Sequence, residues 1–171
     1  MMAISIANMR DLSTVTEMDK MEMIVGTSPN QVPCPLDHFF TPGIYTRKIL
    51  MPAGTFVVSM KHKTTHPFFI MKGKVAVLKE KEGGGFEVEG LFEAGYMGVT
   101  RPDTKRFLYN IEDTVWITCH ANPDNIQDPD EMVVSYTHKN DNPLHDPDDP
   151  RFNGWKKDIS PSLIHNQLQL S

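Results

Sequence analysis

The sequence has little cysteine and no long apolar run, and each shortage excludes a class of protein. Two cysteines, Cys34 and Cys119, are too few for a disulfide scaffold, and their spacing fits no zinc-binding motif. No apolar stretch approaches the roughly 20 residues that cross a bilayer. Residues 1–20 lack the apolar core of a secretory signal. The motifs of phosphate loops, dinucleotide-binding folds and serine hydrolases are also missing. We therefore expect an intracellular protein without membrane association.

The sequence also has fewer positively charged residues than negatively charged ones, 17 Lys and Arg against 22 Asp and Glu. The 171 residues carry a formal net charge of -5. A general nucleic-acid binder needs a basic surface to neutralise phosphates. The sequence therefore predicts no nucleic-acid partner, although it leaves room for a local basic patch.

The middle of the chain has the texture of an all-β domain. Short runs of β-branched and aromatic residues alternate with turn residues between 43 and 138, which is typical of a sandwich or barrel. We predict one barrel domain over 41–138. Its expected strands are Ile44–Met51, Thr55–Lys61, Phe68–Met71, Lys74–Lys79, Gly85–Val88, Arg106–Ile111, Val115–His120 and Met132–Thr137.

The two ends of the chain have a different composition. Residues 1–40 form a predicted N-terminal arm, in which Met9, Leu12, Val15 and Met18 recur every three residues and can form one short amphipathic helix. Residues 139–171 contain four prolines among many Asp and Asn, with isolated apolar residues, which indicates an extended C-terminal arm. The acidic stretch at 146–149 has no role that the sequence defines.

The segment from Gly54 to Gly73 resembles the first conserved motif of the cupin superfamily. That motif runs Gly, five residues, His-x-His, three or four residues, Glu, six residues, Gly. Here Met60 stands at the first His, His62 at the second and His66 at the Glu position, with all spacings kept. The resemblance implies a double-stranded β-helix, also called a jelly-roll barrel, with extended arms at both ends.

The second cupin motif is only loosely echoed. Gly95 lies one residue too far from Pro102, Thr104 replaces a Gly, Phe107 stands at the His position and Ile111 at the Asn position. The resemblance thus covers roughly residues 44–120 but lacks part of its metal-binding chemistry.

The resemblance implies a metal site at the cavity of the barrel. In cupins the inward-facing His and Glu side chains bind one divalent ion, such as Fe, Mn, Ni or Zn. Here His62 and His66 are the candidate ligands, and His120, near the end of a later strand, is a candidate third. The alternative interpretation is that these histidines are ordinary polar residues at a strand turn and that no cofactor binds.

Several cations gather around Pro102, on a loop that in cupins lies at the barrel mouth. Among them Lys105 and Arg106 are the candidates for binding a small anion or a phosphate. The alternative is that they are solvated residues of a hairpin in an otherwise acidic chain.

A second resemblance is narrower. The pieces PxxHFFTPGIY at 35–45, MPAGT at 51–55 and IEDTVWITCH at 111–120 resemble small cupin-like proteins encoded by tailed bacteriophages. The resemblance implies a phage virion or accessory protein, located in the virion or the host cytoplasm.

Our leading hypothesis is a non-catalytic interaction module, in which no residue is assigned a catalytic role. The partners we expect are further copies of the chain or other virion proteins, contacted through the two arms. Two alternatives stay open. One is a metal-dependent cupin enzyme acting on a small molecule, and the other is a small-anion-binding protein.

Overall fold

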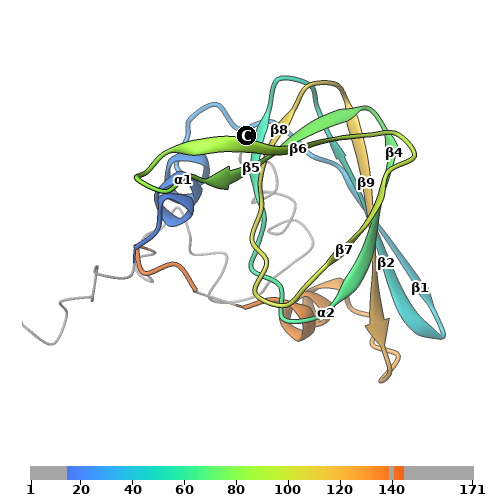
Figure 1. Cartoon of the computed structure of the whole chain (residues 1–171). Helices are drawn as coiled ribbons and strands as arrows, with labels where there is room; N and C mark the ends of the chain where they lie inside the picture. Colours follow the sequence, from blue (N-terminus) through green and yellow to red (C-terminus); the bar gives the residue numbers. More distant parts are fainter. Residues whose placement is uncertain (1–14, 139–140, 145–171) are drawn as a thin grey trace, which may run out of the picture.

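The structure is a computed structural model that describes residues 15–138 and 141–144. Nine strands and two helices follow one another along this part of the chain (Figure 1). The bounds are α1 Glu17–Gly26, β1 Leu36–Thr41, β2 Gly43–Met51, β3 Phe56–Val58, β4 His66–Lys72, β5 Lys74–Glu80, β6 Phe86–Glu93, β7 Met97–Thr100, β8 Phe107–Asn110, β9 Thr114–Asn122 and α2 Pro129–Tyr136. No helix within the described residues is long and apolar enough to cross a membrane.

The strands form two antiparallel sheets that face each other. Sheet A has the order β1-β2-β9-β4-β7, and sheet B has the order β3-β8-β5-β6. From β2 to β9 the chain crosses repeatedly between the sheets, so that most strands pair with partners distant in sequence. This order is that of the double-stranded β-helix, or jelly roll, the fold that cupins share. The predicted all-β, cupin-type fold is confirmed.

The core lies between the two sheets, because alternate residues of each strand point inward. In β2 the buried residues are Tyr45, Arg47, Ile49 and Met51, every second position. On the inner face of sheet A the rings of Phe68 on β4 and Trp116 on the neighbouring β9 stack with their centroids 4.5 Å apart. The positively charged Arg47 in this apolar series is the exception that matters for the site below.

The turn between β4 and β5 requires a glycine. Gly73 has a φ of +81°, and a Cβ added there would lie 2.1 Å from the backbone oxygen of Asp113. The glycine that closes the motif in the sequence thus allows β4 to turn tightly into β5 against the loop before β9. The segment from Gly54 to Gly73 contains β3, a connecting loop and β4, and both of its histidines are buried.

One predicted strand is wrong. Residues 132–137, expected as a strand, belong mainly to helix α2. The helix begins at Asp128, whose side chain accepts a hydrogen bond from the backbone of Asp130, and Pro129 occupies its first turn, where no amide donor is needed. The neighbouring pair Val133 and Val134 favoured a strand in the sequence, but the Asp-Pro start outweighs it.

Two strands were missed. β1 and β7 are flanked by proline or glycine, which hid them in the sequence. Because β1 pairs along its length with β2, the sheet begins at Leu36 and not at residue 41. The N-terminal helix likewise lies at Glu17–Gly26, later than the three-residue spacing indicated. The rest of that spacing, and most of the expected C-terminal arm, lie outside the described residues.

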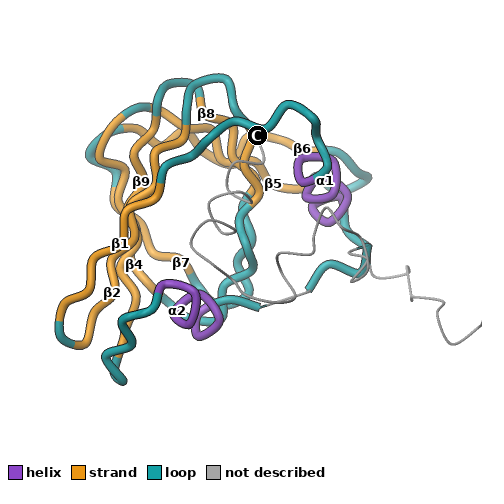
Figure 2. The backbone as a smooth tube through the Cα atoms, turned by 180° about the vertical axis from the view of Figure 1, so that it is seen from behind, coloured by secondary structure: helices purple, strands orange, loops and turns teal. Residues whose placement is uncertain are grey.

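Helix α1 packs against the outer side of sheet B. Figure 2, which views the molecule from behind, shows α1 well separated from α2. Its Val25 joins Val58 of β3 and Phe107 of β8 in a small apolar cluster. The segment 141–144 lies next to the same helix, because the Asn142 amide donates a hydrogen bond to the backbone oxygen of Asp19. Helix α2 lies at another end of the barrel, close to β4 and β7 (Figure 1).

Candidate functional site

Three imidazoles meet inside the barrel. The ring of His66 lies 4.7 Å from that of His62 and 4.2 Å from that of His120, measured between centroids, and the outer two are 6.4 Å apart. All three side chains are buried, with His66 only 2% and His120 only 1% exposed. The structure therefore brings together the three histidines that the sequence put forward as metal ligands.

Each histidine owes its place to a different element. His66 is the first residue of β4 and pairs with Thr100 of β7. His120 shares the inner face of β9 with Trp116 and Thr118, because side chains alternate along a strand. His62 lies in the loop after β3, where it forms a bridge to Thr137 just after α2.

The phenol ring of Tyr136, from α2, closes one side of this cluster. It stacks on His120 with centroids 3.8 Å apart and an interplanar angle of 17°. The ring of Tyr45, on β2, stacks on His120 and lies tilted against Tyr136. The Tyr45 hydroxyl lies 2.6 Å from Nδ1 of His38. Helix α2 thus supplies an aromatic wall to a site otherwise built from strands.

The histidines are neutral at physiological pH. Burial lowers the pKa of His62 to about 3, of His66 to about 4 and of His120 to about 2. For His62 and His120 the neighbouring imidazoles add to this effect, and for all three the guanidinium of Arg47 contributes. A proton on any one ring would be a charge in a dry interior beside a permanent cation.

Two arginines face the same interior. Arg47 is 8% exposed, and its Nε and Nη2 atoms are buried without a hydrogen-bond partner among the described residues. Arg106, which precedes β8, donates from Nη1 to the hydroxyl of Thr100 at 2.8 Å. Its guanidinium also lies over the ring of Phe68, 4.8 Å from the centroid. Burial lowers the pKa of Arg106, and the carboxylate of Glu89 opposes that effect.

A cavity of about 60 Å³ joins these groups. Its polar lining comes from the two arginines, two of the histidines and three hydroxyl residues, and its apolar lining from both sheets. The lining residues are Arg47, Ile49, Met51, Val57, Ser59, His62, His66, Thr100, Arg106, Leu108, Trp116 and Thr118. No carboxylate is among them, so the cavity carries two positive charges and no negative one.

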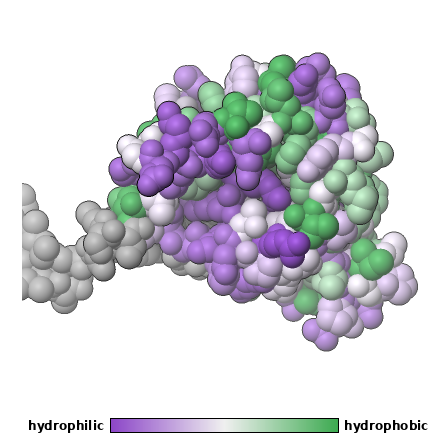
Figure 3. Space-filling model, in the orientation of Figure 1, coloured by the Kyte–Doolittle hydropathy of each residue, from purple (hydrophilic) through white to green (hydrophobic). Residues whose placement is uncertain are grey.

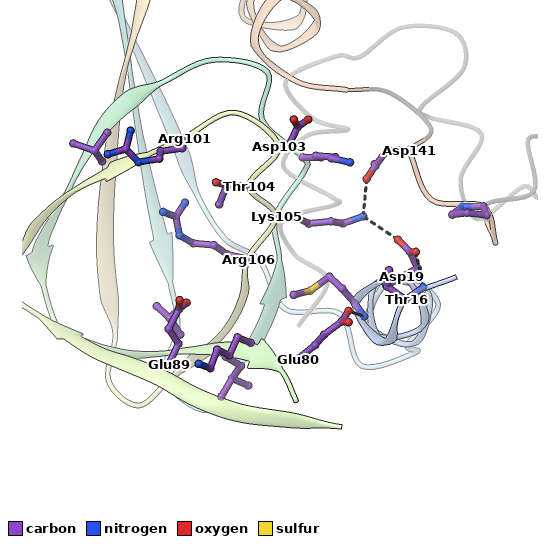
Figure 4. A pocket seen from close by; sticks show the side chains of 17 residues that line it. Thr16, Asp19, Glu80, Glu89, Arg101, Asp103, Thr104, Lys105, Arg106 and Asp141 are labelled. Atoms are coloured by element: carbon purple, nitrogen blue, oxygen red, sulfur yellow. Dashed lines mark hydrogen bonds and ion pairs between the residues drawn. The ribbon is translucent and has the colours of Figure 1, made fainter. Parts of the chain in front are cut away.

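The other predicted anion-binding residue, Lys105, points the opposite way, into an outer groove of about 760 Å³ (Figure 4). Its ammonium lies 2.5 Å from Glu22, 3.3 Å from Asp141 and 3.8 Å from Asp19. Burial would lower the pKa of Lys105, but the carboxylates raise it more strongly. Burial also raises the pKa of Glu22 against the influence of Lys105. Lys105 is thus neutralised within the protein, while Arg106 is not.

Arg106 lines both the outer groove and the inner cavity. Figure 4 shows its side chain on the far side of the loop from Lys105, with Glu89 below it on β6. The face in Figure 3 has a hollow at its middle where hydrophilic residues gather. Arg106 therefore stands between the inner cavity and an open, polar groove.

The residues do not fit the metal that the cupin resemblance implies. Within the described part of the chain, no group of three or more His, Cys, Asp or Glu side chains is arranged to hold a metal ion. Met60 and Phe107 occupy two of the four ligand positions of the motifs. Two nearby guanidiniums would also repel a divalent cation, and no lining carboxylate would offset them.

The sequence reasoning missed Arg47 and Tyr136. Arg47 had a readable signal, since a charged residue at every-second-residue spacing between Tyr45 and Ile49 must lie on the inner face of its strand. Tyr136 had none, because its position depends on α2, which the sequence presented as a strand.

Comparisons with known proteins give likeness in solved structures alone. No family model matches the sequence, and no curated protein sequence matches it. An RmlC-like cupin protein from Ralstonia eutropha aligns with a TM-score of 0.42 and 16% identity, over 56% of this chain and 60% of that one. The Cupin_2 domain of an XRE family transcriptional regulator from Enterobacter cloacae aligns with a TM-score of 0.40 and 12% identity, over 53% of this chain and 98% of that one.

Oxalate decarboxylase from Bacillus subtilis aligns with a TM-score of 0.44 and 12% identity, over 58% of this chain. The match spans only 28% of the decarboxylase chain. Likenesses at these identities say nothing about activity, and the cupin neighbours include both an enzyme and a domain of a regulator. The cupin-type jelly-roll fold of this chain is established by the strand order of its two sheets.

Proposed function

We propose that the barrel is a binding module for a small organic anion, whose carboxylate is held by Arg47 and Arg106 inside the cavity. The observation that carries the proposal is the buried guanidinium of Arg47, in which Nε and Nη2 find no hydrogen-bond partner within residues 15–138 and 141–144. An isolated charge inside a protein is strongly unfavourable unless it is paired and hydrogen-bonded. A bound anion would supply the missing charge and the missing acceptors.

The chemistry of the two arginines suits a carboxylate. A guanidinium presents a planar fork of donors that matches the two oxygens of a carboxylate. Arg106 already uses one nitrogen on Thr100, so its other donors are the ones that would reach a ligand. Because the three imidazoles are neutral, the cavity's only full charges are the two guanidiniums.

The size of the cavity limits the ligand to a few atoms. A space of about 60 Å³ compares with the roughly 10–15 Å³ that one water molecule needs by a similar measure. Room therefore exists for about four or five non-hydrogen atoms. The apolar lining, which includes Trp116 and Leu108, favours a short hydrocarbon part next to the carboxylate.

Titration calorimetry with acetate tests the proposal. We expect acetate to bind the wild-type protein and to bind Arg47→Met at least about tenfold more weakly, because a hydrogen bond to a charged group contributes roughly 1.5–3 kcal/mol. Arg47→Met should fold, since an apolar side chain of similar length replaces an unpaired buried charge. Arg101→Met is the matched control, because Arg101 is exposed in the outer groove.

The result that would overturn the proposal is equal acetate affinity in the wild type and Arg47→Met, or no heat of binding to the wild type at about 50 mM acetate. An equal loss in Arg101→Met would also count against it, because the effect would then be one of general surface charge.

A metal-dependent cupin enzyme, the alternative from the sequence, has weaker support, because the cavity lining as described above does not fit a divalent ion. One observation favours it: Nε2 of His66 and Nδ1 of His120 are buried without a partner among the described residues, and neutral imidazole is a common ligand of Zn and Fe. Elemental analysis of the purified protein would support this candidate if it found near-stoichiometric metal that His62→Ala with His66→Ala abolished.

The role in a phage particle stays a prediction from the sequence resemblance. The arms expected to contact other copies or other virion proteins fall mostly on residues 1–14 and 145–171, outside the described part. An anion-binding barrel is compatible with such a role, because ligand and partner would use different surfaces. Mass spectrometry of purified phage particles tests this role, and failure to detect the protein in them would count against it.

A further inference from the structure

The ring nitrogens of His62 and His66 can be assigned from their partners. Nδ1 of His62 lies 3.3 Å from the backbone oxygen of Thr104, and Nδ1 of His66 lies 3.2 Å from that of Thr64. A carbonyl oxygen only accepts hydrogen bonds, so each Nδ1 carries the proton. In a neutral imidazole the other nitrogen is then bare, which leaves each Nε2 as an acceptor.

These acceptors belong to the cavity. Both histidines line it, and Nε2 of His66 is buried with no hydrogen-bond partner in the described part of the chain. The lowered pKa values, about 3 for His62 and about 4 for His66, keep the rings unprotonated at physiological pH. The cavity thus holds two positively charged donors and two neutral acceptors.

We infer that the ligand is a small hydroxycarboxylic acid, whose carboxylate contacts Arg47 and Arg106 and whose hydroxyl donates to Nε2 of His66 or His62. This inference rests on the proposed function. A buried acceptor that stays unpaired is unfavourable, and a hydroxyl of the ligand would satisfy it. An ammonium group could also donate, but two guanidiniums in the same small cavity would repel it.

Glycolate and propionate are the matched probes, because each has five non-hydrogen atoms and they differ by a hydroxyl in place of a methyl group. We expect calorimetry to give glycolate at least about tenfold higher affinity than propionate, since leaving a buried acceptor unpaired costs roughly 1–3 kcal/mol. Glycine, which carries an ammonium at the same position, should bind more weakly than propionate.

At least one of the variants His66→Leu and His62→Leu should lose the preference for glycolate and keep the affinity for propionate. His138→Leu is the control, because the side chain of His138 is 41% exposed and does not line the cavity. If His66→Leu fails to fold, nitrogen NMR of wild-type imidazoles replaces it. Glycolate should then shift the Nε2 resonance of His66 or His62, and propionate should leave both in place.

The outcomes separate this inference from the proposed function. Equal affinities for glycolate and propionate would overturn the hydroxy-acid inference while the anion-binding proposal stood. A preference for glycolate that survived in both His66→Leu and His62→Leu would overturn it as well. Absence of binding for both acids would instead overturn the proposed function on which it rests.

Discussion

Each histidine of the buried cluster is kept neutral by burial, and this couples the stability of the protein to pH. The folded-state pKa values of about 3, 4 and 2 for His62, His66 and His120 lie far below the ordinary histidine pKa of 6.5. As pH falls below about 6.5, these histidines bind protons in the unfolded chain but not in the folded chain. The groups that face the rings, Arg47, Arg106 and Tyr136, add no negative charge.

We predict that the free energy of unfolding falls between pH 6.5 and pH 5, by up to about 1.4 kcal/mol per pH unit for each fully protonating histidine. Burial also lowers the pKa of His38, which adds to this dependence of stability on pH. Burial raises the pKa of Glu22, which acts in the opposite direction. Urea denaturation at a series of pH values, with a chelator present, measures the slope.

Replacing His120 by Phe should flatten that slope by about one histidine's share. A wild-type stability that stays constant from pH 6.5 to pH 5 would contradict the neutral, buried cluster.

The residues of the site were partly predictable. Spacing in the first motif identified His62 and His66, although only His66 lies on a strand and His62 lies in the loop after β3. His120 followed only from its place near a strand end. The charge balance of the cavity was not predictable, because it depends on where Arg47, Arg106 and Lys105 point. Lys105 and Arg106 are adjacent in sequence, but of the two only Arg106 lines the inner cavity.

At the scale of elements, helix α1 is attached to the barrel by charge as well as by apolar contact. Lys105, on the loop before β8, lies between Glu22 and Asp19 of the helix and Asp141 beyond the second helix. Its side chain is 9% exposed. This cluster ties three segments that are distant in sequence to one point.

We predict that Lys105→Met destabilises the protein by about 3 kcal/mol, because removing one partner leaves partly buried carboxylates unpaired. Urea denaturation measures the loss, and hydrogen exchange should show it first in α1. Lys79→Met is the control, because its ion pair with Glu87 is exposed and should contribute about 1 kcal/mol or less. Equal effects of the two substitutions would show that the cluster does not anchor the helix.

The elements themselves were predictable where their pattern was local. The alternation in β2, β5 and β9 was visible in the sequence, and the barrel follows from it. The strand β1 and the helix α2 were not, because proline next to each one can mark either a boundary or a first turn. Contacts with residues distant in sequence decide which of the two roles the proline takes, and a window of a few residues does not contain those contacts.

At the scale of the whole molecule, two sheets of apolar residues close around a small polar interior. The interior of a small barrel is either filled by side chains or holds one small ligand. Here the interior keeps about 60 Å³ of space beside Arg47, whose buried Nε and Nη2 atoms have no hydrogen-bond partner among the described residues. The central claim is therefore that an anion completes the interior of the barrel.

Crystals of the wild-type protein soaked in bromide test that claim most directly, because bromide is a small anion whose anomalous scattering locates it without ambiguity. We predict a bromide peak inside the barrel within hydrogen-bonding range of the Arg47 guanidinium, and its absence in crystals of Arg47→Met. Bromide found only on the outer surface of the protein, with the cavity holding water alone, would contradict the account.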